Sequence, residues 1–231
     1  MKLARAIKAV AGTLVFALVA TVVAVGAPTS TSAANNTNVT QAINAGTLTT
    51  DIRDASRNPI ASPTFALAAT TFSFNCQTTT GTIGSSSQRL YVDNPGAANN
   101  GFTLTIAATA GATATWANGG VTQTFDFNDP TGAGCTDGGD ADSKGGQLQL
   151  DASASTLTAD CSTCSTTGLT KGSSTAFSQA VTDSITLLTA ASGSDDVGRW
   201  YLTGIGVSQT IPAEQPNDNY TINLTVTVTA S

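Results

Sequence analysis

The sequence predicts an all-β fold, an immunoglobulin-like β-sandwich with long polar loops, and three observations carry this prediction. Short apolar–polar alternations recur along the chain, clusters of Gly, Asn, Asp and Ser separate them, and helical periodicity is nearly absent. Only 10% of the residues are charged, against about 25% in an average globular protein. Threonine, serine, alanine, glycine and asparagine replace them, which is typical of extracellular β proteins. A chain of 231 residues is long enough for one such domain with a sizeable core.

The N-terminus has the pattern of a secretory signal. Three basic residues precede an apolar run over residues 9–27, and the small residues Ser32-Ala33-Ala34 follow. Signal peptides require this order of positive charge, apolar stretch and small-residue cleavage site. We therefore expect a signal helix and peptide over residues 1–34. An uncleaved membrane anchor and a pilin-type leader cut after Gly12 are the alternatives.

The strands are expected downstream of this leader. Residues 35–63 are polar, with one weak strand in INAGTLTTDI, and residues 64–231 hold the predicted sandwich. Its expected strands lie at 65–67, 72–74, 90–92, 102–106, 121–127, 148–150, 185–188, 200–207 and 220–229. The last is the clearest, because aliphatic residues and Tyr220 occupy one face while threonines and Asn223 occupy the other. The segment AFSQAVTD is the one place where we expect a short helix.

The four cysteines indicate an oxidising compartment and leave three pairings open. Cys161 and Cys164 form a CxxC within a threonine-rich turn. A redox role needs a helix N-terminus that lowers a thiol pKa, so we favour a local structural disulfide. Cys76 would then pair with Cys135. A zinc site with four cysteine ligands is the alternative.

Several classes of enzyme are excluded by composition. The chain has no histidine and a single glutamate, Glu214. A Ser-His-Asp or Cys-His arrangement and histidine-ligated zinc are therefore impossible. An aspartate-based glycosidase needs two carboxylates about 5–10 Å apart, and the sequence singles out no pair. We expect a protein that is not an enzyme, and no nucleic-acid partner either, because the net charge is −6 and no basic patch is present.

The stretch DFNDPTGAGCTDGGDADSKGG, residues 126–146, is the one candidate metal site. Calcium takes six to eight oxygen ligands, and glycines let backbone carbonyls turn inward. The candidate ligands are Asp126, Asn128, Asp129, Asp137, Asp140 and Asp142. Their spacing does not match an EF-hand, and the alternative is a solvated loop whose aspartates cap turns. A disulfide at Cys135 would tether this loop and favour calcium.

Three aromatic residues are candidates for contact with a glycan. Trp116 lies beside a glycine turn, and Trp200 and Tyr201 begin a predicted strand. An exposed ring would offer a stacking platform for sugar. The alternative for Trp200 is a core position with Arg199 at the rim.

Two segments resemble the WxL-type cell-surface domains. SQTIPAEQPNDNYTINLTVTVTAS, residues 208–231, is similar to their closing turn and strand, and NNGFTLTIAATA, residues 99–110, is similar to their first motif. Phe102 stands where that motif has its Trp, and Val226-Thr227-Val228 stands where the second motif has Trp-x-Leu. The resemblance implies a β-sandwich that is secreted and held non-covalently on the cell wall, some members binding peptidoglycan.

Two functions follow as expectations. The first is a secreted, non-enzymatic protein of the cell surface or cell wall, structural or weakly glycan-binding, with a wall polymer or other surface proteins as partners. The second is a subunit of an extracellular filament in which copies of the chain donate strands to one another. The long, proline-free strand at 220–229 and the segment 35–52 would pair in such a filament.

Overall fold

The computed structural model describes residues 40–96, 100–138 and 142–231. The predicted signal peptide lies outside these residues. Residues Asn44–Ser231 form one compact unit, so the polar segment before residue 64 belongs in part to the folded domain. Its strand β1 (Thr49–Arg53) pairs with β3 (Arg89–Asn94), at the end of the weak strand predicted there.

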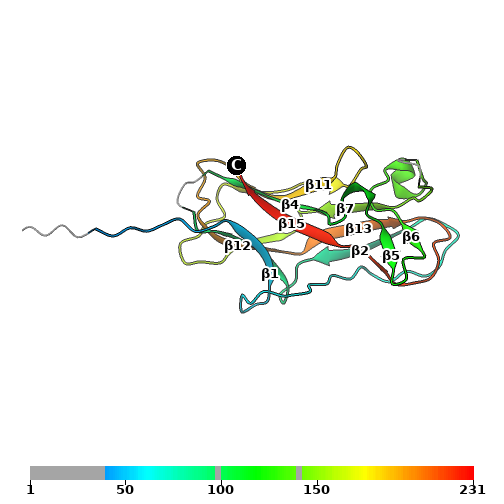
Figure 1. The fold of residues 1–231 in the computed structure, drawn as a ribbon, viewed down its shortest axis with the longest axis horizontal. Helices are drawn as coiled ribbons and strands as arrows, with labels where there is room; N and C mark the ends of the chain where they lie inside the picture. Colours follow the sequence, from blue (N-terminus) through cyan, green and yellow to red (C-terminus); the bar gives the residue numbers. More distant parts are fainter. Residues whose placement is uncertain (1–39, 97–99, 139–141) are drawn as a thin grey trace, which may run out of the picture. The chain divides into compact units, whose positions relative to one another are not determined.

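One layer of the fold consists of three long strands, each interrupted at the same level (Figure 1). They are β2 (Gln77–Ile83) with β3, β7 (Gln147–Asp151) with β8 (Thr156–Ala159), and β12 (Gly198–Thr203) with β13 (Ile205–Ile211). All pair antiparallel around β12 and β13. At the break, the Gly204 N–H donates to the Gly84 carbonyl at 2.9 Å, and both glycines have positive φ. β1 and β10 (Ser174–Ala176) form the edges of the layer.

The second layer has the order β15-β4-β11-β9. These strands are β15 (Leu224–Ala230), β4 (Phe102–Ala108), β11 (Ser184–Ala190) and β9 (Leu169–Lys171), again antiparallel. The chain crosses between layers from β9 to β10 at Gly172. A Cβ there would lie 1.9 Å from the Thr186 carbonyl oxygen, so only glycine fits at this crossing.

The core lies between the two layers. β4 alternates strictly, with Phe102, Leu104 and Ile106 buried, and the Phe102 ring lies 5.9 Å from that of Trp200 on β12. Burying each such side chain stabilises the fold by about 1.5–3 kcal/mol. Two antiparallel layers around one apolar core confirm the all-β prediction and are consistent with a β-sandwich.

Several predicted elements differ from those observed. The strands expected at 65–67 and 72–74 do not form; that segment follows β2 irregularly, with Ala68 N–H donating to the Thr80 carbonyl at 2.8 Å. The helix expected at AFSQAVTD is wrong. It is a turn in which Thr182 N–H donates to the Ser178 carbonyl at 2.6 Å, with Ala180 at positive φ. The strand expected at 121–127 shrinks to β6 (Thr124–Phe125).

Helical structure in the described ranges is limited to two short 3₁₀ turns, η1 (Gly111–Thr113) and η2 (Thr131–Gly134). Among these same residues, no helix has the length and apolarity needed to span a bilayer. A small third sheet joins β14 (Tyr220–Thr221), β5 (Trp116–Asn118) and β6. This sheet positions the candidate site.

Candidate ligand groove

The third sheet brings three aromatic rings together from distant parts of the chain. Trp116 on β5 is the register partner of Phe125 on β6, and their rings stack with centroids 5.8 Å apart and planes 7° apart. The Tyr220 ring from β14 meets Phe125 edge-on at 5.1 Å. The Trp116 Nε1–H donates to Gln209 Oε1 at 2.8 Å, which fixes the indole from the side of β13. The pairing of three short strands therefore holds the cluster rigid.

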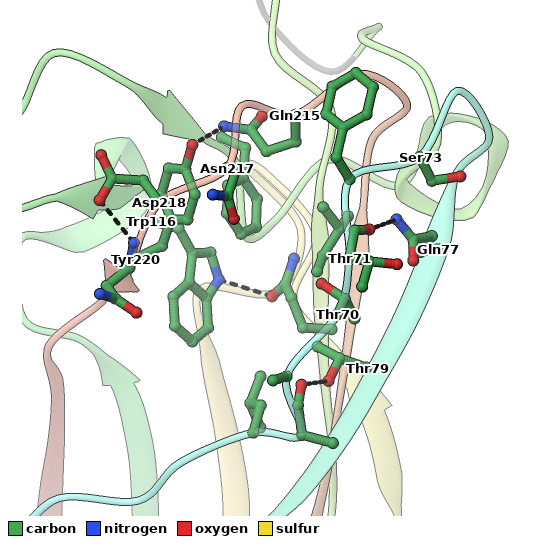
Figure 2. Close-up of a pocket in the computed structure, with 18 of the residues that line it drawn as sticks. Thr70, Thr71, Ser73, Gln77, Thr79, Trp116, Gln215, Asn217, Asp218 and Tyr220 are labelled. Carbon is green, nitrogen blue, oxygen red and sulfur yellow. Dashed lines mark hydrogen bonds between the residues drawn. The ribbon is translucent and has the colours of Figure 1, made fainter.

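These rings form one wall of a hollow of about 470 Å³, which we call the aromatic hollow. Figure 2 shows Trp116, Asp218 and Tyr220 on one side and Thr70, Thr71 and Gln77 on the other. The second wall is the irregular segment 65–73. β2 holds that segment in place, because Gln77 Nε2 donates to the Thr71 carbonyl at 2.8 Å and Thr79 Oγ1 donates to the Ala68 carbonyl.

A second hollow of about 290 Å³, the apolar hollow, continues from the first. The two share Phe65, Leu67, Trp116 and Tyr220 in their walls, so they are consecutive parts of one groove. The apolar hollow is lined by aliphatic side chains from both layers, including Ile52, Ile83, Ile106, Val207, Leu224 and Val226. The groove therefore follows the open side of the sandwich and changes from polar and aromatic to apolar along its length.

Asp218 is the one charged residue among those that line either hollow. Its Oδ2 accepts from Asn118 Nδ2 at 2.8 Å and its Oδ1 accepts from the Asn219 N–H at 2.8 Å. The hydrogen bond from Asn118, followed by that from Asn219, holds the pKa of Asp218 below its usual range. Asn118 is itself fixed, since its Oδ1 accepts from the Thr122 N–H at 2.9 Å. Asp218 therefore presents an oriented, ionised carboxylate at the mouth of the hollow.

The Tyr220 hydroxyl is also oriented by its neighbours. It donates to the Pro216 carbonyl at 2.7 Å and accepts from Gln215 Nε2 at 2.8 Å. Aromatic rings, amides, hydroxyls and one carboxylate together offer stacking and hydrogen bonds but little net charge. Such a lining suits a polar, largely uncharged ligand.

The three aromatics singled out in the sequence do not gather in one place. Trp116 lies in the groove. Trp200 is fully buried, and its Nε1–H donates to the Ser165 carbonyl at 2.7 Å, so its ring belongs to the core and offers no face to a sugar. Tyr201 lies apart from the groove, with the Arg89 guanidinium 4.6 Å above its ring and Tyr91 5.3 Å away.

Four groove residues were missed in the sequence: Phe125, Gln209, Asp218 and Tyr220. Tyr220 had been placed on the apolar face of the last strand, and its half-buried position agrees with that. The third-sheet pairing is what turns it toward Trp116. The alternation also gave no sign of Gln209, a polar residue that is 1% exposed. A buried glutamine in a strand of apolar alternation was the signal available.

The aspartate-rich stretch is organised by its own backbone. Asp129, which is buried, accepts from the N–H groups of Thr131 at 2.8 Å and Gly138 at 2.9 Å. Asp126 Oδ1 accepts from the Phe127 N–H at 2.7 Å. Asp142 Oδ1 accepts from the Lys144 N–H at 3.0 Å. These bonds are the turn caps that the solvated-loop alternative requires.

The other predicted calcium ligands add no cluster to these. Asn128 is buried and donates to the Ala112 carbonyl at 3.0 Å, Asp137 is exposed, and Asp140 lies outside the described residues. In residues 40–96, 100–138 and 142–231, no three acidic, cysteine or histidine residues come together as metal ligands. We therefore assign no calcium to this stretch.

Both disulfides that the sequence analysis favours are present. Cys76 is joined to Cys135 across 59 residues, and Cys161 is joined to Cys164. The first ties the aspartate-rich loop to the start of β2, beside the groove wall. The second supports β12, since Cys164 Sγ accepts from the Arg199 N–H at 3.1 Å.

No protein-family model, no curated protein and no solved structure matches this chain. The argument for function therefore rests on the groove and on the strands around it.

Proposed function

We propose that this protein is a secreted, non-enzymatic component of the cell surface, with an immunoglobulin-like strand arrangement, that contacts a neutral wall glycan through the aromatic hollow. The observation that carries the proposal is the set of Trp116, Phe125 and Tyr220 beside the oriented Asp218. The secretory leader pattern and the WxL-like segments support the location.

The hollow suits sugar rings on physical grounds. The apolar face of a pyranose stacks on an aromatic ring, and its hydroxyls need donors and acceptors around the rim. The amides of Gln215 and Asn217 and the hydroxyls of Thr70 and Thr71 line the hollow opposite or beside the rings. A hollow open along one side releases its ligand readily, so we expect a dissociation constant on the order of 1 mM for a short oligosaccharide.

Charge sets the preferred class of glycan. The carboxylate of Asp218 accepts hydrogen bonds from sugar hydroxyls or from an ammonium group. It repels uronic acids and phosphate-bearing polymers, and the net charge of −6 acts in the same direction. Neutral or amino-sugar oligosaccharides should therefore bind in preference to anionic ones.

NMR titration of the exported protein with soluble neutral peptidoglycan fragments and with an anionic wall polymer tests this proposal. Trp116→Ala should weaken binding of the neutral fragments at least tenfold, and Asp218→Asn should weaken it less while leaving the fold intact. Tyr201→Ala removes an aromatic residue outside the groove and serves as the matched control. Equal binding by the wild-type chain and both groove variants would refute the assignment.

A further inference from the structure

β15 presents a long, open strand edge. It pairs with β4 alone, and no strand in the described part of the chain lies on its other side. Flanking hydrogen bonds, from Thr109 N–H to the Asn223 carbonyl and from Ser231 N–H to the Gly101 carbonyl, fix the ladder. Hydrogen-bonded pairs recur at every second residue of an antiparallel ladder. The odd-numbered residues of β15 therefore bond β4, and the backbone groups of Leu224, Val226, Val228 and Ala230 point to the open side.

This edge lacks the features that usually protect edge strands. Its sequence, LTVTVTA, has no charge, no proline and no bulge over seven residues. The other edges are guarded. β10 has three residues, β8 has four, and the irregular segment 65–73 covers β2. β1 carries Asp51 and Arg53, and its Ile52 carbonyl accepts from the Ile60 N–H at 2.9 Å.

The apolar hollow lies directly against the open edge. Leu224 and Val226 line it, and core side chains such as Ile106 and Leu148 are reached through it. An added strand would therefore find both a backbone to pair with and a hollow for an apolar side chain.

The chain carries a segment of matching length and character. Residues 40–47, TQAINAGT, are exposed throughout, form no strand and precede β1 directly. They contain no charge and no proline. Ile43 is 92% exposed, the highest value among the large hydrophobic side chains of the described residues. Eight residues span the seven-residue edge, and Ile43 near their middle is the side chain that would enter the apolar hollow.

We propose that residues 40–47 of a second copy add as a strand to the open edge of β15, with Ile43 in the apolar hollow. Each copy then offers one donor segment and one acceptor edge, at different places on its surface. Such a head-to-tail contact does not close on itself unless its rotation happens to form a ring, so repetition produces a filament. This contact is independent of the proposed glycan contact in the aromatic hollow.

The test compares full-length chains exported with their own leader, by light scattering and electron microscopy over a range of concentrations. Wild type should assemble into filaments. Ile43→Asp should raise the concentration needed for assembly at least tenfold, and its exposed position leaves the fold unaffected. Val181→Asp alters another side chain that is 82% exposed, distant in sequence, and should assemble as wild type does. A synthetic peptide of residues 40–48 should inhibit wild-type assembly.

Three outcomes overturn the proposal. One is a wild-type chain that stays monomeric at millimolar concentration. Another is assembly that Ile43→Asp and the peptide leave unchanged. The last is assembly that Val226→Pro abolishes but Ile43→Asp does not, because the edge would then bind something other than residues 40–47, such as a second β15. Glycan binding by an Ile43→Asp monomer separates this result from the fate of the proposed function.

Discussion

β1 and β15 are edge strands of opposite layers that lie beside each other, and they differ in almost every property that controls strand addition (Figure 1). β1 has five residues, two of them charged, and the chain turns back at residues 54–58 to cover it. β15 has seven residues, all uncharged, and its outer side is open. The comparison shows that one fold protects an edge where the chain continues and leaves an edge available where a partner strand would fit.

The charges of β1 are built into a network. Arg53 donates to Asp93 at 2.6 Å and lies 5.2 Å from the Tyr91 ring, while Arg199 donates to the same carboxylate at 2.5 Å. Arg57, in the covering turn, makes two bonds to Asp160 at 2.8 and 3.0 Å. The edge of β1 is therefore closed by ion pairs as well as by backbone bonds.

Proline substitution on the two sides of β15 should give the largest effect. Thr227→Pro removes a bond to β4 and should destabilise the domain by about 3 kcal/mol or more. Val226→Pro removes an N–H that faces the open side and should cost about 1–2 kcal/mol, mainly in lost packing. Chemical denaturation of the two variants measures the difference. Equal losses would mean that the two sides of β15 are used alike.

Removal of the guard on β1 should have a smaller effect. Arg53→Ala deletes a charge-assisted bond and a half-buried aliphatic stem, so we expect a loss of about 1–2 kcal/mol in the free energy of unfolding. Lys144→Ala, at the exposed pair with Asp142, is the control and should cost close to zero. An Arg53→Ala variant as stable as its control would show that the network does not hold β1.

Disruption of the covering turn should show a defined pH dependence. The Arg57 guanidinium holds the pKa of Asp160 below its usual range, so this carboxylate binds a proton less readily when folded than when unfolded. Its contribution is complete above the unfolded pKa and is lost as the pH falls through the folded one. Asp160→Asn should therefore cost about 1 kcal/mol near neutral pH and almost nothing in strong acid. A loss that is constant with pH would contradict this account.

The smallest effect is expected for glycan binding against pH. Asn118 holds the pKa of Asp218 below its usual range, so the carboxylate remains ionised from about pH 5 to pH 8. The affinity for a neutral oligosaccharide should be constant over that interval in an NMR titration. A fall in affinity toward about pH 5 would assign the contact to another group.

The sequence predicted those parts of the fold that depend on local alternation. From Tyr220 to Val228 every second side chain is half-buried and every intervening one is exposed, as the pattern requires. β4 and β11 were predicted for the same reason. β2 was missed because QTTTGTI has too few apolar residues to show a period of two. Its Gly81 is needed because a Cβ there would lie 2.8 Å from the Ala66 carbonyl oxygen.

The groove was beyond sequence reasoning because long-range pairing creates it. Trp116 and Tyr220 are brought together by the register of β5 against β14, which no local pattern records. The aspartate-rich stretch misled in the opposite way, because carboxylates close in sequence bond nearby N–H groups and do not converge. The open edge of β15 was in part predictable, since its length and lack of charge are visible in the sequence.

Amide hydrogen exchange along β15 tests the central claim most directly. In an Ile43→Asp monomer, the amides of Val226 and Val228 should exchange rapidly, while those of Thr225 and Thr227, bonded to β4, are protected. In assembled wild-type protein, the Val226 and Val228 amides should become protected by at least tenfold. Rapid exchange of these two amides in the assembled protein would show that the open edge of β15 is not where copies of the chain meet.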